Sequence, residues 1–222
     1  MKNIPIFLVL LLCVFGCRLF NRGNSATSGS SPSYPASDAN TKQFVNSRDN
    51  LTGNLANNYV DFSFNYPSSW TLDPTAGKPG ASNFAKVEKT NSDNYTMENF
   101  AVGYFSSSGS AEGDKLLFPK LADQLSSQFA KGFPNYAKLS EGATRVGSYD
   151  GYEFRLTATV TDAKGKSLPL WGRVVMIPNT AGKRNGVVII MLATPLAPGV
   201  TSVDDVGVKG ELPVILNSFR LN

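Results

Sequence analysis

Side chains that commonly perform nucleophilic or acid–base chemistry are sparse in this 222-residue sequence, which has no histidine. Ser127 and Lys131 are one helical turn apart, but the surrounding pattern places them on the solvated side of a helix. Asp204 and Asp205 are adjacent carboxylates, and a place in the first turn of a helix explains them without catalysis. A serine nucleophile would lack the histidine that usually activates it. The sequence therefore predicts no catalytic residue, although two carboxylates far apart in the chain would still permit a hydrolase.

Metal and nucleotide sites are equally unsupported. The two cysteines, Cys13 and Cys17, lie within the first 17 residues, so the remaining chain offers neither Cys nor His as a zinc ligand. The pair Gly182-Lys183 lacks the upstream glycine of a phosphate-binding loop. We expect no cofactor and no metal.

A few aromatic and basic side chains are candidates for contact with a partner or ligand. The residues around Trp171 leave its orientation open; if it faces solvent near Tyr149 and Tyr152, it offers the best aromatic contact. Lys183 and Arg184 occupy the tip of a predicted hairpin, where they could hold a phosphate or an acidic group. A solvated turn explains the same two charges equally simply.

The N-terminal residues have the layout of a secretory signal peptide, with Lys2 before the apolar run 6–12. The string Val14-Phe15-Gly16-Cys17 resembles a bacterial lipobox. This resemblance implies that the Cys17 sulfur receives a diacylglycerol, that residues 1–16 are removed and that the new amino terminus is acylated, for example with palmitate. An ordinary cleaved signal with an incidental Cys17 is the alternative. Two or three acyl chains hold a protein firmly on a bilayer, whereas one is marginal.

Residues 17–57 are predicted to form a flexible tether. The segment 24–41 consists mainly of Ser, Ala, Asn, Thr, Pro and Gly, and it cannot bury enough apolar area to offset the entropy of ordering. Within the tether, Phe44-Val45 and the stretch 51–55 could add a short strand or helix to the domain edge. The domain itself is expected over 58–222.

The charge distribution excludes a nucleic-acid partner. The formal net charge is +4, but from residue 59 onward 16 Lys and Arg stand against 15 Asp and Glu. A nucleic-acid footprint needs cations concentrated on one face. The excess positive charge lies in the tether, where Arg18 and Arg22 would meet anionic head groups beside the acylated Cys17.

The apolar residues of the domain follow different spacings in different segments of the chain. A period of two residues predicts a strand over 59–66, and further strands are expected over 84–89, 97–105, 138–146, 152–161 and 168–177. The run 187–192 is apolar at every position and is expected to be a central strand buried on both faces. A spacing of four between Leu117, Leu121, Leu125 and Phe129 predicts an amphipathic helix over 114–131. A last helix is expected near Ser202, with a kink or restart at Pro213. Trp70 is expected to fill the core. These elements predict an α+β fold, an antiparallel β-sheet flanked by helices.

Three segments resemble sequences of a known family: 62–70 (FSFNYPSSW), 151–154 (GYEF) and 217–221 (NSFRL). Together they resemble the PsbP-like superfamily, which includes the photosystem subunit PsbP and DcrB-like bacterial envelope lipoproteins. The resemblance covers about 58–222 and implies an α/β/α sandwich. It also implies a non-enzymatic accessory or binding module on a membrane. Members that bind metals use histidine with carboxylates, so no metal site is transferred to this histidine-free chain.

Two functions follow as expectations. The first is a lipid-anchored envelope lipoprotein that acts as a non-catalytic accessory module for a membrane protein complex, through a sheet edge or hairpin loops. The alternative is a lipoprotein that binds a small molecule or lipid in a cavity between sheet and helices. In either case the domain would face the extracytoplasmic side, the periplasm in a host with two membranes.

Overall fold

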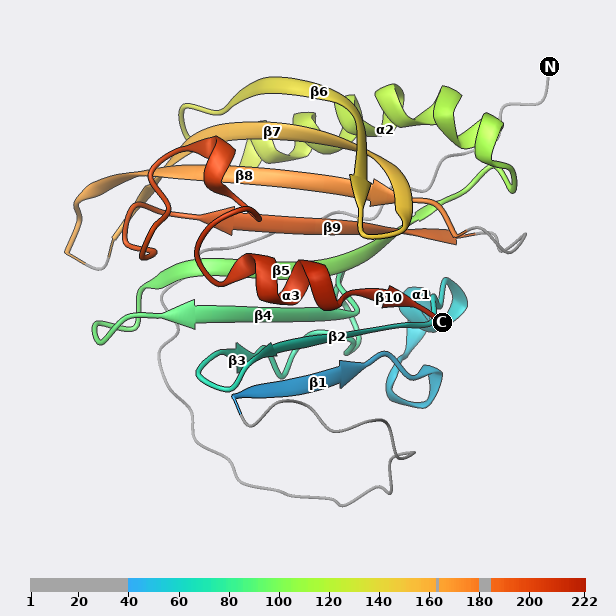
Figure 1. Cartoon of the computed structure of the whole chain (residues 1–222), viewed down its shortest axis with the longest axis horizontal. Coiled ribbons are helices and arrows are strands. Elements are labelled where there is room, and N and C mark those ends of the chain that lie inside the picture. The colour runs from blue at the N-terminus through green and yellow to red at the C-terminus, as the bar shows by residue number, and fades with distance from the viewer. Residues whose placement is uncertain (1–39, 163, 180–184) are drawn as a thin grey trace.

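The computed structural model describes residues 40–162, 164–179 and 185–222 (Figure 1). The elements are, in chain order, β1 (Thr41–Val45), η1 (Arg48–Asn50), α1 (Gly53–Asn57), β2 (Phe62–Pro67), β3 (Thr71–Leu72), β4 (Ala85–Thr90), β5 (Thr96–Ser106), α2 (Ala111–Gly132), β6 (Ala137–Val146), β7 (Tyr149–Thr161), β8 (Ser167–Ile177), β9 (Asn185–Ala193), η2 (Val203–Asp205), α3 (Leu212–Ser218) and β10 (Arg220–Leu221). The predicted α+β class is confirmed.

Two antiparallel sheets organise the chain. The larger has seven strands in the order β3-β4-β5-β9-β8-β7-β6, and the smaller has three in the order β1-β2-β10. Strand β9, predicted to be a central strand buried on both faces, lies between β5 and β8, and residues 186–193 are all buried. Strand β6 ends the seven-stranded sheet, so its outer edge has no neighbouring strand within the described ranges.

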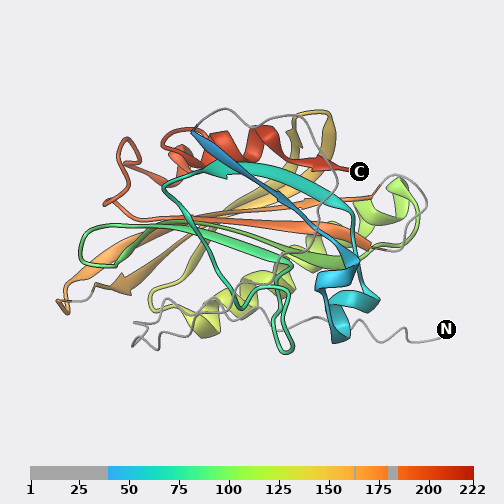
Figure 2. The same ribbon diagram turned by 90° about the horizontal axis from the view of Figure 1, so that it is seen from below.

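The seven-stranded sheet is covered differently on its two faces (Figure 2). Because successive side chains of a strand point to opposite faces, each strand contributes to two cores. Helix α2 packs on one face, which we call the α2 face, through Phe118, Leu121, Leu125 and Phe129. On the other, the α3 face, helix α3 and the small sheet bury a second core that includes Phe62, Phe64 and Trp70. The predicted burial of Trp70 is confirmed by its 2% exposure.

The fold includes residues that the sequence assigned to the flexible tether. Strand β1 pairs with β2 over five residues, from Thr41 opposite Pro67 to Val45 opposite Ser63. Leu55 of α1 is buried in the core of the α3 face, and Leu51 packs beside it. Burial of the apolar clusters at 44–45 and 51–55 thus offsets the entropy cost of ordering residues 41–57. Residues 1–39 lie outside the described ranges.

The C-terminal segment differs from the helix expected near Ser202. Only the short η2 forms there, and α3 begins at Leu212. Gly207 and Gly210 both have φ +74, a left-handed conformation that a continuous α-helix cannot contain. Asp205, one of the adjacent carboxylates, is a structural anchor: it accepts hydrogen bonds from the Thr201 backbone N–H at 2.9 Å and hydroxyl at 2.8 Å. The Lys209 ammonium and these bonds hold the pKa of Asp205 well below its usual range.

Helix α2 begins three residues before the predicted start. Ser110 is its N-cap, and the Ser110 hydroxyl accepts a hydrogen bond from the Gly113 N–H at 3.1 Å. Asp114, the predicted first residue, is instead buried and accepts hydrogen bonds from Ser107 and Ser108, which ties the helix start to the end of β5. Pro119 lies inside the helix and is tolerated there.

Candidate functional site: a polar patch on the alpha3 face

The structure does not bring the three predicted aromatic contact residues together. Trp171 and Tyr149 lie on the α3 face, whereas Tyr152 packs into the core of the α2 face. Trp171 of β8 is opposite Thr157 of β7. Thr157 is eight residues from Tyr149 along the same strand, which corresponds to about 26 Å.

The two tyrosines make contacts that belong to the fold. The Tyr149 hydroxyl accepts a hydrogen bond from the Leu221 N–H at 2.9 Å and so fixes the C-terminal strand. The Tyr152 ring stacks on Phe118 of α2 with centroids 5.7 Å apart, and its hydroxyl donates to Glu141 at 3.2 Å. Lys183, Arg184 and Cys17 lie outside the described residues.

Trp171 differs from both tyrosines and from Trp70. The indole N–H of Trp70 donates to the Glu211 carboxylate at 2.8 Å, so this tryptophan is fixed within the core. Trp171 is only partly buried, and its indole N–H makes no hydrogen bond to any residue that the structure describes. Tryptophan combines a large apolar surface with one polar handle, which is why it is enriched at interfaces. Trp171 is therefore a partly buried aromatic residue whose polar group makes no hydrogen bond within the part of the chain that the structure describes.

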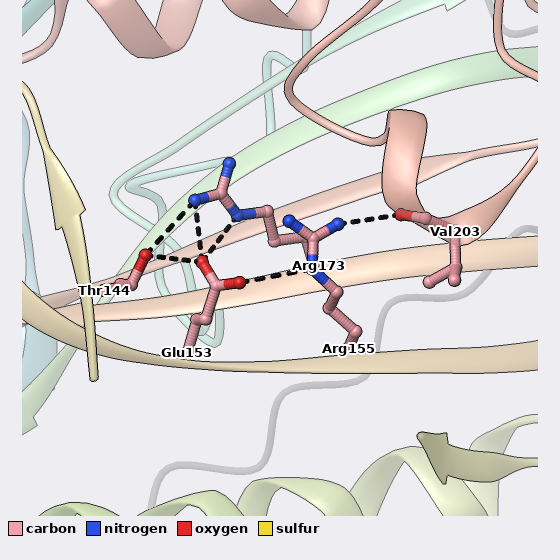
Figure 3. Close-up of polar contacts among 5 residues, drawn as sticks. All are labelled: Thr144, Glu153, Arg155, Arg173 and Val203. Carbon is pink, nitrogen blue, oxygen red and sulfur yellow. Dashed lines mark hydrogen bonds and ion pairs between the residues drawn. The ribbon is translucent and has the colours of Figure 1, made fainter. Parts of the chain in front are cut away.

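Two residues along β8 from Trp171, four side chains form a polar cluster that sequence analysis missed (Figure 3). We call Thr144, Glu153, Arg155 and Arg173 the guanidinium cluster. Arg155 and Arg173 are direct cross-strand partners on β7 and β8. Like charges at such positions repel each other, and the Glu153 carboxylate beside them compensates. It accepts hydrogen bonds from Arg173 Nε at 2.8 Å, from Arg155 Nε at 3.2 Å and from the Thr144 hydroxyl at 2.7 Å.

The electrostatics of the guanidinium cluster depend on Glu153. Burial alone would raise the pKa of this carboxyl. The hydrogen bond from Thr144 and the charges of Arg173 and Arg155 outweigh that effect, and the pKa lies below its ordinary value of 4.5. Glu153 is therefore ionised at neutral pH, and the cluster has two positive charges and one negative charge.

The guanidinium cluster also touches the C-terminal segment. Arg155 Nη1 donates to the carbonyl oxygen of Val203 in η2 at 2.9 Å. A Cβ atom added at Gly207 would lie 3.2 Å from Arg173 Nη1 and 2.9 Å from the sulfur of Met191. The absence of a side chain at Gly207 thus allows the segment to approach Arg173 closely. The hydrogen bond from Arg155 thus helps to hold this segment in place, and Arg173 lies directly against it.

The arrangement supports binding rather than bond-breaking chemistry. Over 40–162, 164–179 and 185–222, no group of three or more Cys, Asp or Glu side chains is placed to hold a metal ion. Guanidinium groups are donors only and have no acceptor atom. They are well suited to donate several hydrogen bonds to a carboxylate or phosphate. None of the helices in these ranges is long and apolar enough to cross a membrane.

A second buried acidic side chain lies on the α3 face. Glu98 of β5 is 0% exposed, and its Oε2 atom has no hydrogen-bond partner in the described part of the chain. Its Oε1 accepts from the Glu211 N–H at 3.4 Å, and a Cβ at Gly210 would lie 2.7 Å from this oxygen. Burial raises the pKa of Glu98, although the Glu211 N–H and Lys89 oppose this. The charged form of Glu98 is therefore a cost to the folded state.

Replacing Glu98 by Gln is expected to increase the free energy of unfolding by about 1 kcal/mol at pH 7, because the variant has no charge to bury. When folding raises the pKa of a carboxyl, the ionised carboxyl destabilises the folded state at pH values above the raised pKa. Below 4.5, the pKa in the unfolded chain, the carboxyl is protonated in both states and has no such effect. The gain should thus vanish below pH 4.5 in urea titrations. Glu112→Gln, at an exposed position on α2, is the control. A gain independent of pH would contradict this account.

Comparisons with protein-family models and with curated proteins find no match. Several solved structures are similar. LpqN, involved in cell envelope biogenesis of Mycobacterium tuberculosis, is 12% identical with a TM-score of 0.45, over 82% of this chain and 91% of that one. The cyanobacterial PsbP (CyanoP) from Synechocystis is 13% identical with a TM-score of 0.48, over 86% and 98%. The Saccharomyces cerevisiae Ran-binding protein Mog1p is 12% identical with a TM-score of 0.42, over 72% and 89%.

The similar structures thus include a PsbP protein. The sequence motifs resemble the superfamily that is named after PsbP. At these identities and TM-scores the likeness concerns the fold alone and says nothing about what this chain binds.

Proposed function

We propose that this protein is a non-catalytic accessory module of the cell envelope, anchored to a membrane through acylated Cys17, that binds a protein complex through the surface around Trp171. The observation that supports this proposal most is the partly exposed Trp171 itself, whose indole N–H is uncommitted within the described residues. Thr157 and Arg155 lie beside it on β7, so an aromatic ring, a hydroxyl and a guanidinium are adjacent. Tryptophan and arginine are both enriched at interface hot spots.

The free edge of β6 extends this surface. Strand β6 has ten residues, and most of them are exposed. Leu139, at the position where the pairing with β7 is irregular, is 54% exposed although it is apolar. Edge strands with unpaired backbone groups can accept another strand, and proteins use this mode to bind extended segments.

The packing gives less support to a ligand held between sheet and helices. Aromatic rings occupy the α3 face, where the centroids of Phe64 and Phe100 are 5.2 Å apart. On the α2 face, Phe129 contacts Phe154 with centroids 6.3 Å apart. These distances are those of rings in direct contact. A lipid or small molecule would have to displace packed side chains.

Chemical cross-linking in intact cells, followed by mass spectrometry, tests the proposed function. We expect a reproducible protein partner with the unmodified chain and at least a fivefold lower yield with Trp171→Ala. The matched control is Leu116→Ala, which removes an 84% exposed side chain on α2, far from the proposed surface. Equal yields from the unmodified chain and Trp171→Ala would argue against this surface, and recovery of lipid without protein would favour the alternative function.

A further inference from the structure

We propose that the guanidinium cluster is a binding site for a carboxylate, supplied by an acidic side chain of the protein partner. This inference rests on the proposed function and specifies the chemistry that the partner must bring. It concerns Arg155 and Arg173, which no motif in the sequence singles out.

The guanidinium cluster carries an excess of positive charge. Arg155 and Arg173 face each other directly across β7 and β8, and Glu153 is the one carboxylate among the described residues that bonds to both. The exposed fractions of these side chains are only 16% for Arg155, 9% for Arg173 and 16% for Glu153. Water therefore screens the remaining positive charge weakly. One further negative charge would make the cluster neutral.

The two guanidinium groups also have donors that the described residues leave uncommitted. Arg173 uses Nε and Nη2 for Glu153 and Thr144, and Arg155 uses Nε for Glu153 and Nη1 for Val203 (Figure 3). Neither Arg173 Nη1 nor Arg155 Nη2 has an acceptor among the residues that the structure describes. A carboxylate has two oxygens and accepts such N–H groups readily.

The β6 side of the cluster has space for a ligand group. The β6 residues opposite Arg155 and Glu153 are Ser140 and Gly142. A Cβ atom added at Gly142 would meet nothing within 4 Å. Small residues at these two positions leave the β6 side of Arg155 open. The acidic side chain that we propose for Arg155 would come from a partner segment lying along β6.

The charge balance favours a carboxylate over a phosphate. A carboxylate contributes one negative charge, which matches the single excess positive charge of the cluster. A phosphate monoester contributes close to two at neutral pH and would leave the site negative. The acidic group is therefore expected to be Asp or Glu in a segment of the partner.

The test is an NMR titration of the purified domain with the peptide acetyl-Gly-Glu-Gly-amide, followed through the Trp171 indole and the Nε–H signals of Arg155 and Arg173. We expect saturable shifts with this peptide and none with acetyl-Gly-Gln-Gly-amide. Arg155→Gln should weaken binding at least fivefold, because one guanidinium and its charge are removed. The matched control is Arg145→Gln, which removes an exposed guanidinium of β6 outside the cluster and should leave the affinity unchanged.

Equal shifts with the two peptides, or shifts that grow linearly with concentration, would overturn the carboxylate site. Inorganic phosphate that saturates the same signals at lower concentration than the Glu peptide would also overturn it. If the amide spectrum shows that Arg155→Gln is unfolded, Arg155→Lys replaces it, since lysine keeps the charge and loses the planar fork. The purified domain needs no cellular partner in this titration, so its outcome is separate from that of the cross-linking experiment.

Discussion

Replacing Glu153 by Gln is expected to lower the free energy of unfolding by about 3 kcal/mol at pH 7, as measured by urea denaturation. The change removes the negative charge between Arg155 and Arg173 and leaves two guanidinium groups directly opposite each other on a largely buried surface. It also weakens the hydrogen bonds that these groups and Thr144 make to the carboxylate. An uncompensated buried charge costs more than the ion pair itself contributes.

The pH dependence has a definite sign. Because folding lowers the pKa of Glu153, its stabilisation is present above the unfolded value of 4.5 and is lost as the pH falls through the lower, folded value. The difference between the unmodified protein and Glu153→Gln should therefore shrink as the pH falls below 4.5. Glu112→Gln is the control and should change stability by less than about 0.5 kcal/mol. A loss below about 1 kcal/mol at pH 7 would show that the charges are already well solvated.

Removing the predicted acylation site is expected to have the largest effect on location. Cys17→Ala leaves no sulfur for a diacylglycerol, so the variant should shift from the membrane pellet to the soluble fraction by at least tenfold in fractionated cells. The physical reason is the loss of buried methylenes, each of which contributes about 0.8 kcal/mol of membrane affinity. Cys13→Ala is the matched control, because Cys13 is preceded by Leu12 and is predicted to be a plain apolar residue.

The two cysteine variants also test the alternative of an ordinary cleaved signal. If the mature N-terminal peptide of the chain without a substitution carries no acyl group, the lipobox interpretation is wrong. A mass shift on the mature N-terminal peptide, present with Cys13→Ala and absent with Cys17→Ala, would identify the modified residue directly.

Much of the fold could be predicted from apolar periodicity. The run 187–192 is apolar at every position and predicted a strand buried on both faces, which β9 confirms. The four-residue spacing from Leu117 to Phe129 predicted α2. The helix expected near Ser202 was wrong because capping and charge signals were considered without Gly207 and Gly210, whose left-handed conformations interrupt it. The two-residue strands β3 and β10 are too short to give any period.

The candidate site was less accessible to sequence reasoning. Trp171 was singled out for its type, and the structure packs it, partly buried, against the core of the α3 face. The guanidinium cluster was missed, although one signal was present. The turn around 162–165 joins two predicted strands. Pairing these strands residue by residue outward from the turn places Arg155 opposite Arg173. An arginine pair at that register requires an anion nearby, and only the register across β6 and β7 brings Thr144 close to Glu153.

The most direct test of the central claim is site-specific photo-cross-linking in intact cells, with benzoylphenylalanine at position 157, beside Trp171. The control carries the same residue at position 116, on the exposed side of α2. If the surface around Trp171 binds an envelope protein, position 157 will give a discrete cross-linked partner that position 116 does not. The same partner captured equally from both positions, or from position 116 alone, would contradict the account.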